Sequence, residues 1–198
     1  MQEKEINELN YWKREAEKDP SILNNPESDR VYKTYLQIDN NTFKDKIVVD
    51  VGCGPLGILR LYNAKLKFGV DHLINEYSRI GYKLLNHDIV YLCCKSEEIC
   101  LIDGYADFVI SRNALDHVDD FYKTMDEIHR ILKRDGELIF AVDLRTRVSS
   151  AAHPRILNKK IIEETCKDRY YDIKIQVYPK GYNDNDTYEV GYFKGRKR

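Results

Sequence analysis

Five short apolar runs are spaced along the middle of the chain. They are rich in valine, isoleucine and leucine, and they cover residues 46–52, 66–71, 88–94, 105–113 and 137–144. Continuous apolar runs of this length are typical of strands that are buried on both faces of a parallel sheet. We therefore predict a parallel strand over each of these ranges.

The segments between the runs carry apolar residues at helical spacing. We predict a helix that starts near Gly57, a second helix over residues 73–85 and a third over residues 121–133. Their apolar faces hold Leu73, Tyr77, Ile80 and Leu84 in the second helix, and Phe121, Met125, Ile128 and Leu132 in the third. Gly136 stands at the usual stop position after the third helix. Strands that alternate with helices predict a sheet covered on both faces.

The end of the chain follows a different pattern. Apolar and polar residues alternate over residues 170–179 and again over residues 187–193, around a turn-rich stretch, KGYNDND. The side chains expected on one face are Tyr171, Ile173, Ile175 and Val177, followed by Tyr188, Val190 and Tyr192. Two alternating strands around a turn predict a hairpin. The fold class is therefore α/β: a Rossmann-like, mostly parallel, seven-stranded sheet with helices on both faces and a C-terminal antiparallel hairpin.

Residues 1–45 precede the first predicted strand. Ile6, Leu9, Trp12 and Ala16 recur at helical spacing, two prolines interrupt the stretch after them, and a second helix is expected around Val31, Tyr35 and Leu36. We expect two parts: an N-terminal helical segment, residues 1–45, and one α/β domain, residues 46–198.

Composition narrows the class of protein. The 198 residues carry 32 basic and 33 acidic side chains, so bulk charge favours neither nucleic acid nor a membrane surface as a partner. No apolar run approaches the length of a membrane span, and the N-terminus is too charged for a signal peptide, so we expect a cytoplasmic protein. The five cysteines form no CxxC pair, which favours buried, reduced thiols and no metal site.

A glycine-rich loop, GCGPLG at residues 52–57, follows the first strand. It matches the pattern GxGxxG, which allows either a dinucleotide or another nucleotide-like ligand at the carboxyl edge of the sheet. Asp50 separates the two possibilities, because its carboxylate would lie close to an anionic pyrophosphate. A carboxylate there suits a ligand with positive groups, such as the ammonium and sulfonium of S-adenosylmethionine.

With these residues in view, the chain resembles class I S-adenosylmethionine-dependent methyltransferases of the methyltransferase-11-like, small-molecule type. The resemblance rests on DVGCG, on Asp71 at the end of the second strand, on KSEEICLIDGYADFVISRNALDHVDD and on FYKTMDEIHRILKRDGELIFAVDLR. These motifs occur in the family's order and spacing over residues 45–194. No single motif carries the resemblance; the co-linear set does.

The resemblance implies roles for named residues in binding S-adenosylmethionine. They are Gly52, Cys53 and Gly54 beside the amino-acid end, Asp50 at the ammonium, Asp71 at the ribose, His72, Ser96 and Glu97 at the adenine, and Asn113 at the methionine part. Each has a simpler structural explanation, such as a helix cap for Asp50 or a surface loop for Ser96 and Glu97. Lys95 stands where many members of the family carry an aspartate.

Three further features concern catalysis. His117 would lie near the methyl group and either accepts a proton from the acceptor or only orients its loop. Arg145, Arg147, His153 and Arg155 either clamp an anionic group of the acceptor or form a solvated loop. Residues 1–45 hold aromatic side chains that either cover the site as a lid or pack on the sheet, namely Tyr11, Trp12, Tyr32 and Tyr35.

The resemblance implies methyl transfer to a small-molecule acceptor, with O-methylation of a sugar, nucleotide-sugar or other metabolite favoured. RNA or protein methylation is an alternative, although residues 111–114, SRNA, lack the Asn/Asp-Pro-Pro-aromatic motif of many N-methylating enzymes. An inactive cofactor-binding module also stays open, as does a dinucleotide oxidoreductase, which Asp50 and the terminal hairpin disfavour.

Overall fold

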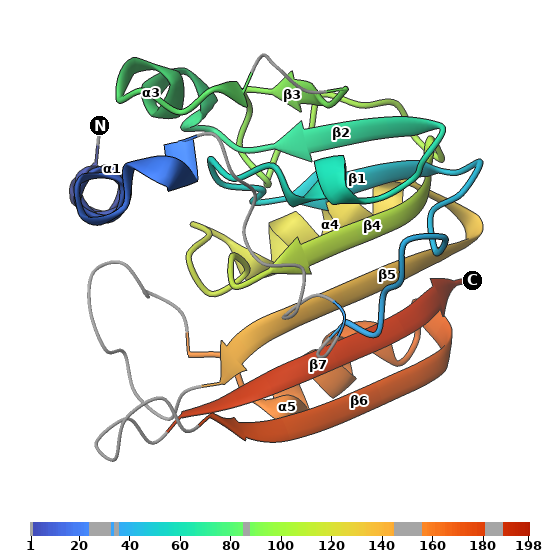
Figure 1. The fold of residues 1–198 in the computed structure, drawn as a ribbon. Helices are drawn as coiled ribbons and strands as arrows, with labels where there is room; N and C mark the ends of the chain where they lie inside the picture. Colours follow the sequence, from blue (N-terminus) through green and yellow to red (C-terminus); the bar gives the residue numbers. More distant parts are fainter. Residues whose placement is uncertain (1, 24–32, 34–35, 85–87, 145–155, 181–187) are drawn as a thin grey trace.

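A computed structural model of the chain describes residues 2–23, 33, 36–84, 88–144, 156–180 and 188–198. One seven-stranded sheet in the order β3-β2-β1-β4-β5-β7-β6 runs through it (Figure 1). The strands are β1 Ile47–Val51, β2 Leu66–Val70, β3 Val90–Leu92, β4 Ala106–Arg112, β5 Leu132–Leu144, β6 Tyr170–Lys180 and β7 Tyr188–Lys197.

The predicted fold class is confirmed. Strands β1 to β5 pair in parallel, whereas β7 is antiparallel to both β5 and β6. The strand order reverses between β1 and β4, which are neighbours in the middle of the sheet. In open α/β sheets, ligands bind beyond the carboxyl ends of the strands at this switch point. The fold therefore places the glycine loop after β1 at the expected binding edge.

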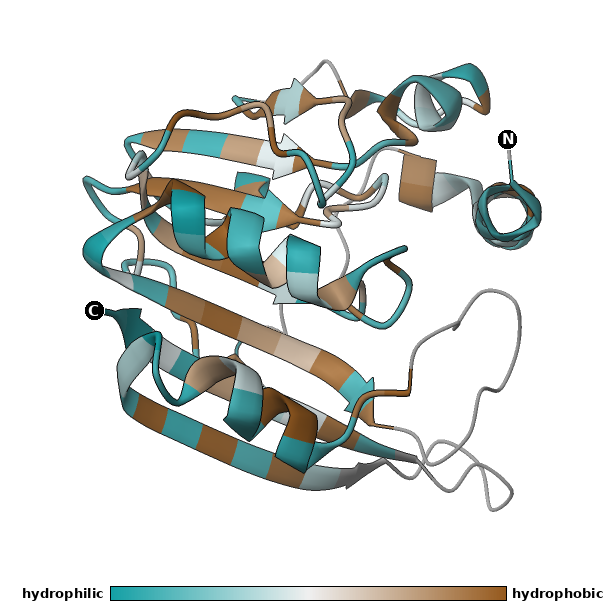
Figure 2. Ribbon diagram, turned by 180° about the vertical axis from the view of Figure 1, so that it is seen from behind, coloured by the Kyte–Doolittle hydropathy of each residue, from teal (hydrophilic) through white to brown (hydrophobic). Residues whose placement is uncertain are grey.

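Two helices cover one face of the sheet. Helix α4, Phe121–Ile131, and helix α5, Lys159–Cys166, pack on a core formed with the inner side chains of the strands. The outer sides of both helices are hydrophilic, while the strands beneath them are largely hydrophobic (Figure 2). All four residues predicted for the apolar face of the third helix are buried, although Leu132 already belongs to β5.

The opposite face is covered by short and irregular segments. Beside the buried Leu36, Ile38 and Phe43 lies η2, Ile58–Leu61, a single turn of 3₁₀ helix. The helix predicted near Gly57 is therefore much shorter than expected. The helix ends because Tyr62, with φ of −116° and ψ of 144°, is already extended, and residues 62–65 lead into β2.

Helix α4 does not stop at the predicted glycine. Asp135, with φ of 62°, takes the left-handed conformation, while Gly136 lies within β5. A Cβ at Gly136 would be 2.9 Å from Leu132 Cδ2 and 3.2 Å from the carbonyl oxygen of Ala106. Gly136 is required for this close strand approach, not for a helix cap.

The C-terminal hairpin forms as predicted, but its alternation starts differently. A register shift between Tyr171 and Lys174, with Asp172 at φ of 50°, moves Tyr170 into the core and leaves Ile173 38% exposed. Ile175 and Val177 pack against the core as expected. The bulge adds one residue to β6. The side chains before it therefore lie on the opposite faces of the sheet from those predicted.

The N-terminal helix α1, Glu3–Lys18, is confirmed and leads into η1, Pro20–Leu23. No residue of α1 is buried, but Leu9, Trp12 and Ala16 contact a small apolar cluster around helix α3, Ile74–Arg79. The predicted second N-terminal helix falls largely outside the described residues, and Leu36 lies in a bend. Among the described helices, none has the length and apolar character needed to span a membrane.

Candidate functional site

A cavity of about 770 Å³ lies at the carboxyl edge of the strands, with α1 as its outer wall. Its volume is in the range typical of small-molecule and cofactor sites. Most of the predicted site residues line it: Gly52, Cys53, Gly54, Asp71, His72, Ser96, Glu97, Asn113 and His117. The structure therefore brings together, around one cavity, side chains that are spread over 66 positions of the sequence, from 52 to 117.

The glycine loop is held flat against the end of the sheet. The backbone N–H groups of Gly52 and Cys53 donate to the carbonyl oxygen of Val70, at 2.8 and 3.2 Å. Gly52 and Gly54 have φ values of 72° and 58°. A Cβ at Gly52 would lie 2.3 Å from the Cβ of Ala114, so a glycine is needed here for conformation and for space.

Asp50 lies beneath this loop. It is only 1% exposed, pairs in register with Gly69 and Ile110, and is not among the residues that line the cavity. Its charge reaches the loop nonetheless: burial, Asp71 and Asp50 together raise the pKa of the Cys53 thiol well above its ordinary value. The role of Asp50 at the ammonium stays a prediction.

Asp71 forms the floor of the cavity at the end of β2. Its two carboxylate oxygens accept hydrogen bonds from the backbone N–H groups of Gly54, at 3.0 Å, and Leu73, at 2.9 Å. Burial raises the pKa of Asp71, and the bond from Leu73 and the nearby His72 oppose that rise. Each oxygen of a carboxylate can accept a second hydrogen bond, so Asp71 retains capacity for two hydroxyl groups of a ligand.

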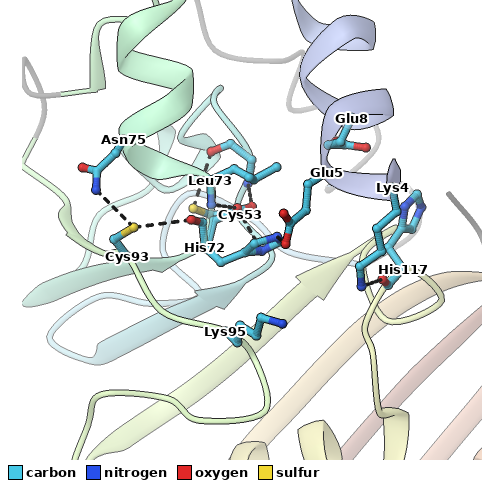
Figure 3. Close-up of polar contacts among 12 residues, drawn as sticks. Lys4, Glu5, Glu8, Cys53, His72, Leu73, Asn75, Cys93, Lys95 and His117 are labelled. Carbon is cyan, nitrogen blue, oxygen red and sulfur yellow. Dashed lines mark hydrogen bonds and ion pairs between the residues drawn. The ribbon is translucent and has the colours of Figure 1, made fainter. Parts of the chain in front are cut away.

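His72 links the end of β2 to α1. Its Nε2 lies 3.4 Å from Glu5 Oε1 and its Nδ1 lies 3.9 Å from Asp71 Oδ1. Figure 3 shows Glu5 pointing from α1 toward His72, while Lys4 points toward His117. The histidine predicted to flank the adenine is therefore also part of the contact between α1 and the sheet.

Glu97 and Lys95 shape the loop before α4. The Glu97 carboxylate accepts bonds from the backbone N–H groups of Asp119, at 2.7 Å, and Asp120, at 3.0 Å. The Lys95 ammonium lies 2.7 Å from the carboxylate of Asp119. Lys95, which departs from the family pattern, thus has Asp119 as a structural partner. One carboxylate oxygen of Glu97, Oε1, accepts both bonds that hold this loop.

Asn113 and Asp143 meet at the ends of β4 and β5. Asn113 has φ of 50°, and its amide, oriented to suit its neighbours, donates to both oxygens of Asp143 at 3.2 Å. Asp143 is 4% exposed and lines the cavity. Sequence reasoning missed it, although an acidic residue near the end of an otherwise apolar strand was a usable signal.

His117 lies on the rim of the cavity. Its Nε2 is 3.7 Å from Oδ1 of the fully buried Asp116, and its backbone N–H donates to the carbonyl oxygen of Ala114 at 2.9 Å. The ammonium of Lys4 donates to the His117 carbonyl oxygen at 3.1 Å. An imidazole beside a buried carboxylate is suited to accepting a proton.

Helix α1 contributes a wall that sequence reasoning identified only in part. Tyr11 and Trp12 were expected there, and both line the cavity. Lys4 was missed, although its ammonium donates to Asp119 Oδ1 at 2.5 Å. Trp12 contacts Tyr82 edge to face, with ring centres 6.1 Å apart. The other proposed covering residues, Tyr32, Tyr35 and the basic residues between 145 and 155, lie outside the described residues.

Comparison with known proteins shows a similarity to methyltransferases. Residues 49–140 match the family model described as a methyltransferase domain. These residues are similar to the methyltransferase domain of class I S-adenosylmethionine-dependent enzymes, whose cofactor is S-adenosyl-L-methionine. The match favours this cofactor over a dinucleotide.

Three proteins illustrate what the chain is similar to. It is 18% identical to a Thermotoga maritima protein described as a possible histamine N-methyltransferase, covering 97% of this chain and 99% of that one, with a TM-score of 0.68. It is 17% identical to Haemonchus contortus phosphoethanolamine N-methyltransferase 2, covering 85% and 51%, with a TM-score of 0.66. An uncharacterised Methanocaldococcus jannaschii protein is 34% identical over 102 residues, 50% of this chain and 41% of that one. The chain thus spans about half the length of the Haemonchus protein and less than half of the Methanocaldococcus protein.

The residues present suit this cofactor. The cavity offers an open glycine loop for close backbone approach and an acidic side chain, Asp71, with acceptor capacity for hydroxyl groups. Two further buried carboxylates, Asp50 and Asp143, lie at the same edge of the sheet and favour a ligand with cationic groups. No group of three or more metal-ligating side chains occurs among the residues that the structure describes.

Proposed function

We propose that this chain transfers the methyl group of S-adenosylmethionine to a small-molecule acceptor, and that the accepting atom is a hydroxyl oxygen. The observation that carries the proposal is the composition of one cavity: it combines the glycine loop, Asp71 and the His117–Asp116 pair under a single wall, α1. A cavity of about 770 Å³ has the size expected for a cofactor together with a small acceptor.

In this proposal, the residues of the chain bind and orient the cofactor. The loop from Gly52 through Cys53 to Gly54 admits the amino-acid end, Asp71 accepts the ribose hydroxyl groups, and Asp50 acts from below the loop through a bridging water. The side chains at the adenine end are His72, Ser96 and Glu97, and Asn113 lies at the methionine part. When bound, the cofactor supplies an electrophilic methyl group on a sulfonium.

The chain's own chemistry is then alignment and proton removal. Placing a hydroxyl oxygen in line with the methyl group makes the reaction effectively unimolecular. His117 accepts the hydroxyl proton as the oxygen attacks, and the buried carboxylate of Asp116, 3.7 Å from Nε2 of the ring, can orient the imidazole. A positioned base of this kind contributes roughly 10²–10⁴-fold to the rate.

A small amine is the second candidate acceptor. Two structural relatives are described in terms of small amines, one as a possible histamine N-methyltransferase and one as a phosphoethanolamine N-methyltransferase. The acidic residues that line the cavity also favour a cationic molecule, and they include Glu5, Glu8, Asp71 and Asp143. An RNA acceptor has less support, because the acidic and basic charges on the chain nearly balance.

We also propose that residues 1–45 act as a lid on the methyltransferase domain, residues 46–198. Helix α1 has no buried residue: Leu9, Trp12 and Ala16 pack on the outside of the cluster around α3, and Lys4 bonds both Asp119 and the His117 carbonyl oxygen. A helix held in this way can open without disrupting the core. Closing it excludes water from the sulfonium and completes the acceptor site.

The function is tested in two steps. Calorimetry should detect binding of S-adenosylhomocysteine but not of NAD, and mass spectrometry should then detect methyl transfer across a panel of sugars, phenols, amines and tRNA. We expect His117→Gln to lower kcat by about 10²-fold or more while leaving the Kd for S-adenosylhomocysteine unchanged. Tight NAD binding would contradict the class, and unchanged kcat in the variant would remove His117 as the base.

The lid is tested with a matched pair of variants on α1. Lys4→Gln removes the bonds from α1 to Asp119 and to the His117 carbonyl oxygen, so the closed lid is less stable. The KM for the acceptor and the Kd for S-adenosylhomocysteine should therefore rise. Lys13→Gln, an exposed position of the same helix that is not among the residues lining the cavity, should change neither. The same KM and Kd in both variants would contradict the lid and would show that α1 is a fixed wall of the cavity.

A further inference from the structure

Three of the five cysteines lie close together between β3 and β4. The expectation of buried thiols holds for Cys166 but is wrong for this group, because Cys93 and Cys100 are exposed and Cys94 is half-buried. All five are free thiols. The segment that carries them also carries Lys95, Ser96 and Glu97 of the cavity, so chemistry at these thiols takes place beside the cofactor site.

Cys94 and Cys100 lie close together across a tight loop. The backbone N–H of Cys100 donates to Cys94 Sγ at 3.4 Å, and the Cys100 thiol donates to the carbonyl oxygen of Glu98 at 3.8 Å. The Cβ of Cys100 is two covalent bonds from that nitrogen, roughly 2.5 Å along the chain. A disulfide needs a Cβ–Cβ separation of about 3.5–4.5 Å, which an adjustment of the loop backbone supplies, and rotation about χ1 then brings the two sulfurs together.

Cys93 is turned toward other partners, although it is adjacent to Cys94. Its Sγ lies 3.4 Å from the His72 carbonyl oxygen and 3.5 Å from Asn75 Nδ2, as Figure 3 shows. The chain therefore offers a built-in comparison between two exposed thiols: the backbone N–H of Cys100 bonds the Cys94 sulfur, whereas Cys93 bonds the His72 carbonyl oxygen and the Asn75 amide.

We propose that Cys94 and Cys100 form a reversible disulfide when the protein meets a peroxide, and that this disulfide weakens cofactor binding. The Cys100 thiolate attacks one peroxide oxygen, the O–O bond breaks, and the departing hydroxide takes a proton to leave water and a sulfenic acid. The Cys94 sulfur then attacks the Cys100 sulfur, the S–O bond breaks, and a second water leaves. Each sulfur loses one electron to the peroxide oxygens.

The order of the two steps follows from exposure. Cys100 is open to solvent, so it meets the oxidant first. Burial raises the pKa of Cys94 to about 11, which keeps this thiol protonated at neutral pH until a sulfenic acid forms beside it. A dithiol reductant reverses the bond, so the site can be cycled.

The coupling to the cofactor arises from the loop that the disulfide closes. Drawing Cys94 and Cys100 together to an S–S bond of about 2.05 Å displaces the backbone between them, which carries the cavity residues Ser96 and Glu97. Glu97 also holds the backbone N–H groups of Asp119 and Asp120, so the displacement reaches the loop that follows His117. This coupling rests on the proposed cofactor site.

Peptide mapping of the full chain tests the bond directly. Trypsin cuts after Lys83, Lys95 and Arg112, so the disulfide joins peptide 84–95 to peptide 96–112 after peroxide treatment and alkylation of the remaining thiols. The linked pair should separate with dithiothreitol, should persist in Cys93→Ser and should be absent in Cys94→Ser and Cys100→Ser. A link through Cys93, or oxidation of Cys100 with no link, would overturn the proposal.

Calorimetry with S-adenosylhomocysteine tests the coupling. The oxidised wild-type chain should bind several-fold more weakly than the reduced chain, and Cys100→Ser should bind equally with and without peroxide. An unchanged Kd in the linked protein would overturn the coupling. Failure of the reduced chain to bind at all would instead contradict the proposed function, while the peptide map would still decide whether the disulfide forms.

Discussion

Substituting alanine for each of two glycines in the loop after β1 separates two sources of destabilisation, backbone strain and steric clash. Gly52 and Gly54 both have positive φ, at 72° and 58°. A Cβ at Gly52 would lie 2.3 Å from the Cβ of Ala114, whereas the nearest atom to a Cβ at Gly54 is Trp12 Cζ2 at 3.8 Å. Gly54→Ala therefore adds backbone strain alone, and Gly52→Ala adds the same strain and a steric clash.

The two costs have different magnitudes. A left-handed conformation costs a residue with a Cβ about 1–2 kcal/mol. Relieving a clash in a packed region costs a further ~1–3 kcal/mol. We expect Gly54→Ala to lower the free energy of unfolding by about 1–2 kcal/mol and Gly52→Ala by about 2–5 kcal/mol, out of a total of about 5–15 kcal/mol for a domain.

Urea unfolding followed by far-ultraviolet circular dichroism measures both values. Circular dichroism is preferable to fluorescence, because the single tryptophan, Trp12, lies on α1 and reports on that helix. A second substitution, Ala114→Gly, removes the clashing methyl group and should recover about 1–3 kcal/mol in the Gly52→Ala background after its own cost is subtracted. It should recover nothing in the Gly54→Ala background. Equal losses in the two single variants, or no recovery, would refute the reasoning.

Two further predictions concern carboxylates of the cavity. Asp71→Asn should weaken binding of S-adenosylhomocysteine by about 1.5–3 kcal/mol, the value of a hydrogen bond to a charged group, whereas Asp88→Asn, at an exposed carboxylate paired with Lys67, should leave the Kd from calorimetry unchanged. Bonds from Lys4 and Lys95 lower the pKa of Asp119 to about 2. The stabilisation from these bonds is present above the ordinary pKa of about 3.9 and is lost as the pH falls toward 2. In acid titrations the free energy of unfolding of Asp119→Asn should therefore depend less on pH over that window than that of the wild type. An unchanged pH dependence would contradict the pairing.

The sequence by itself determined the architecture and the cofactor loop. Continuous apolar runs predict strands that are buried on both faces, whereas the alternating end of the chain predicts a hairpin with one buried and one exposed face. The glycine loop and Asp71 lie within 20 residues of each other on consecutive strands, and parallel strands bring their carboxyl ends to one edge. These features depend on short stretches of chain, so periodicity and motif spacing were enough to find them.

Only the tertiary structure decided which distant side chains meet. Lys4 reaches Asp119 across 115 positions of the sequence, and Asn113 meets Asp143 only because β4 and β5 end side by side. The exposure of Cys93 and Cys100 depended on what covers β3, and the shortening of the helix after Gly57 depended on how β2 pairs with β1. Such contacts are set by topology and register, because the local pattern specifies the face on which a side chain lies but not the partner that packs against it.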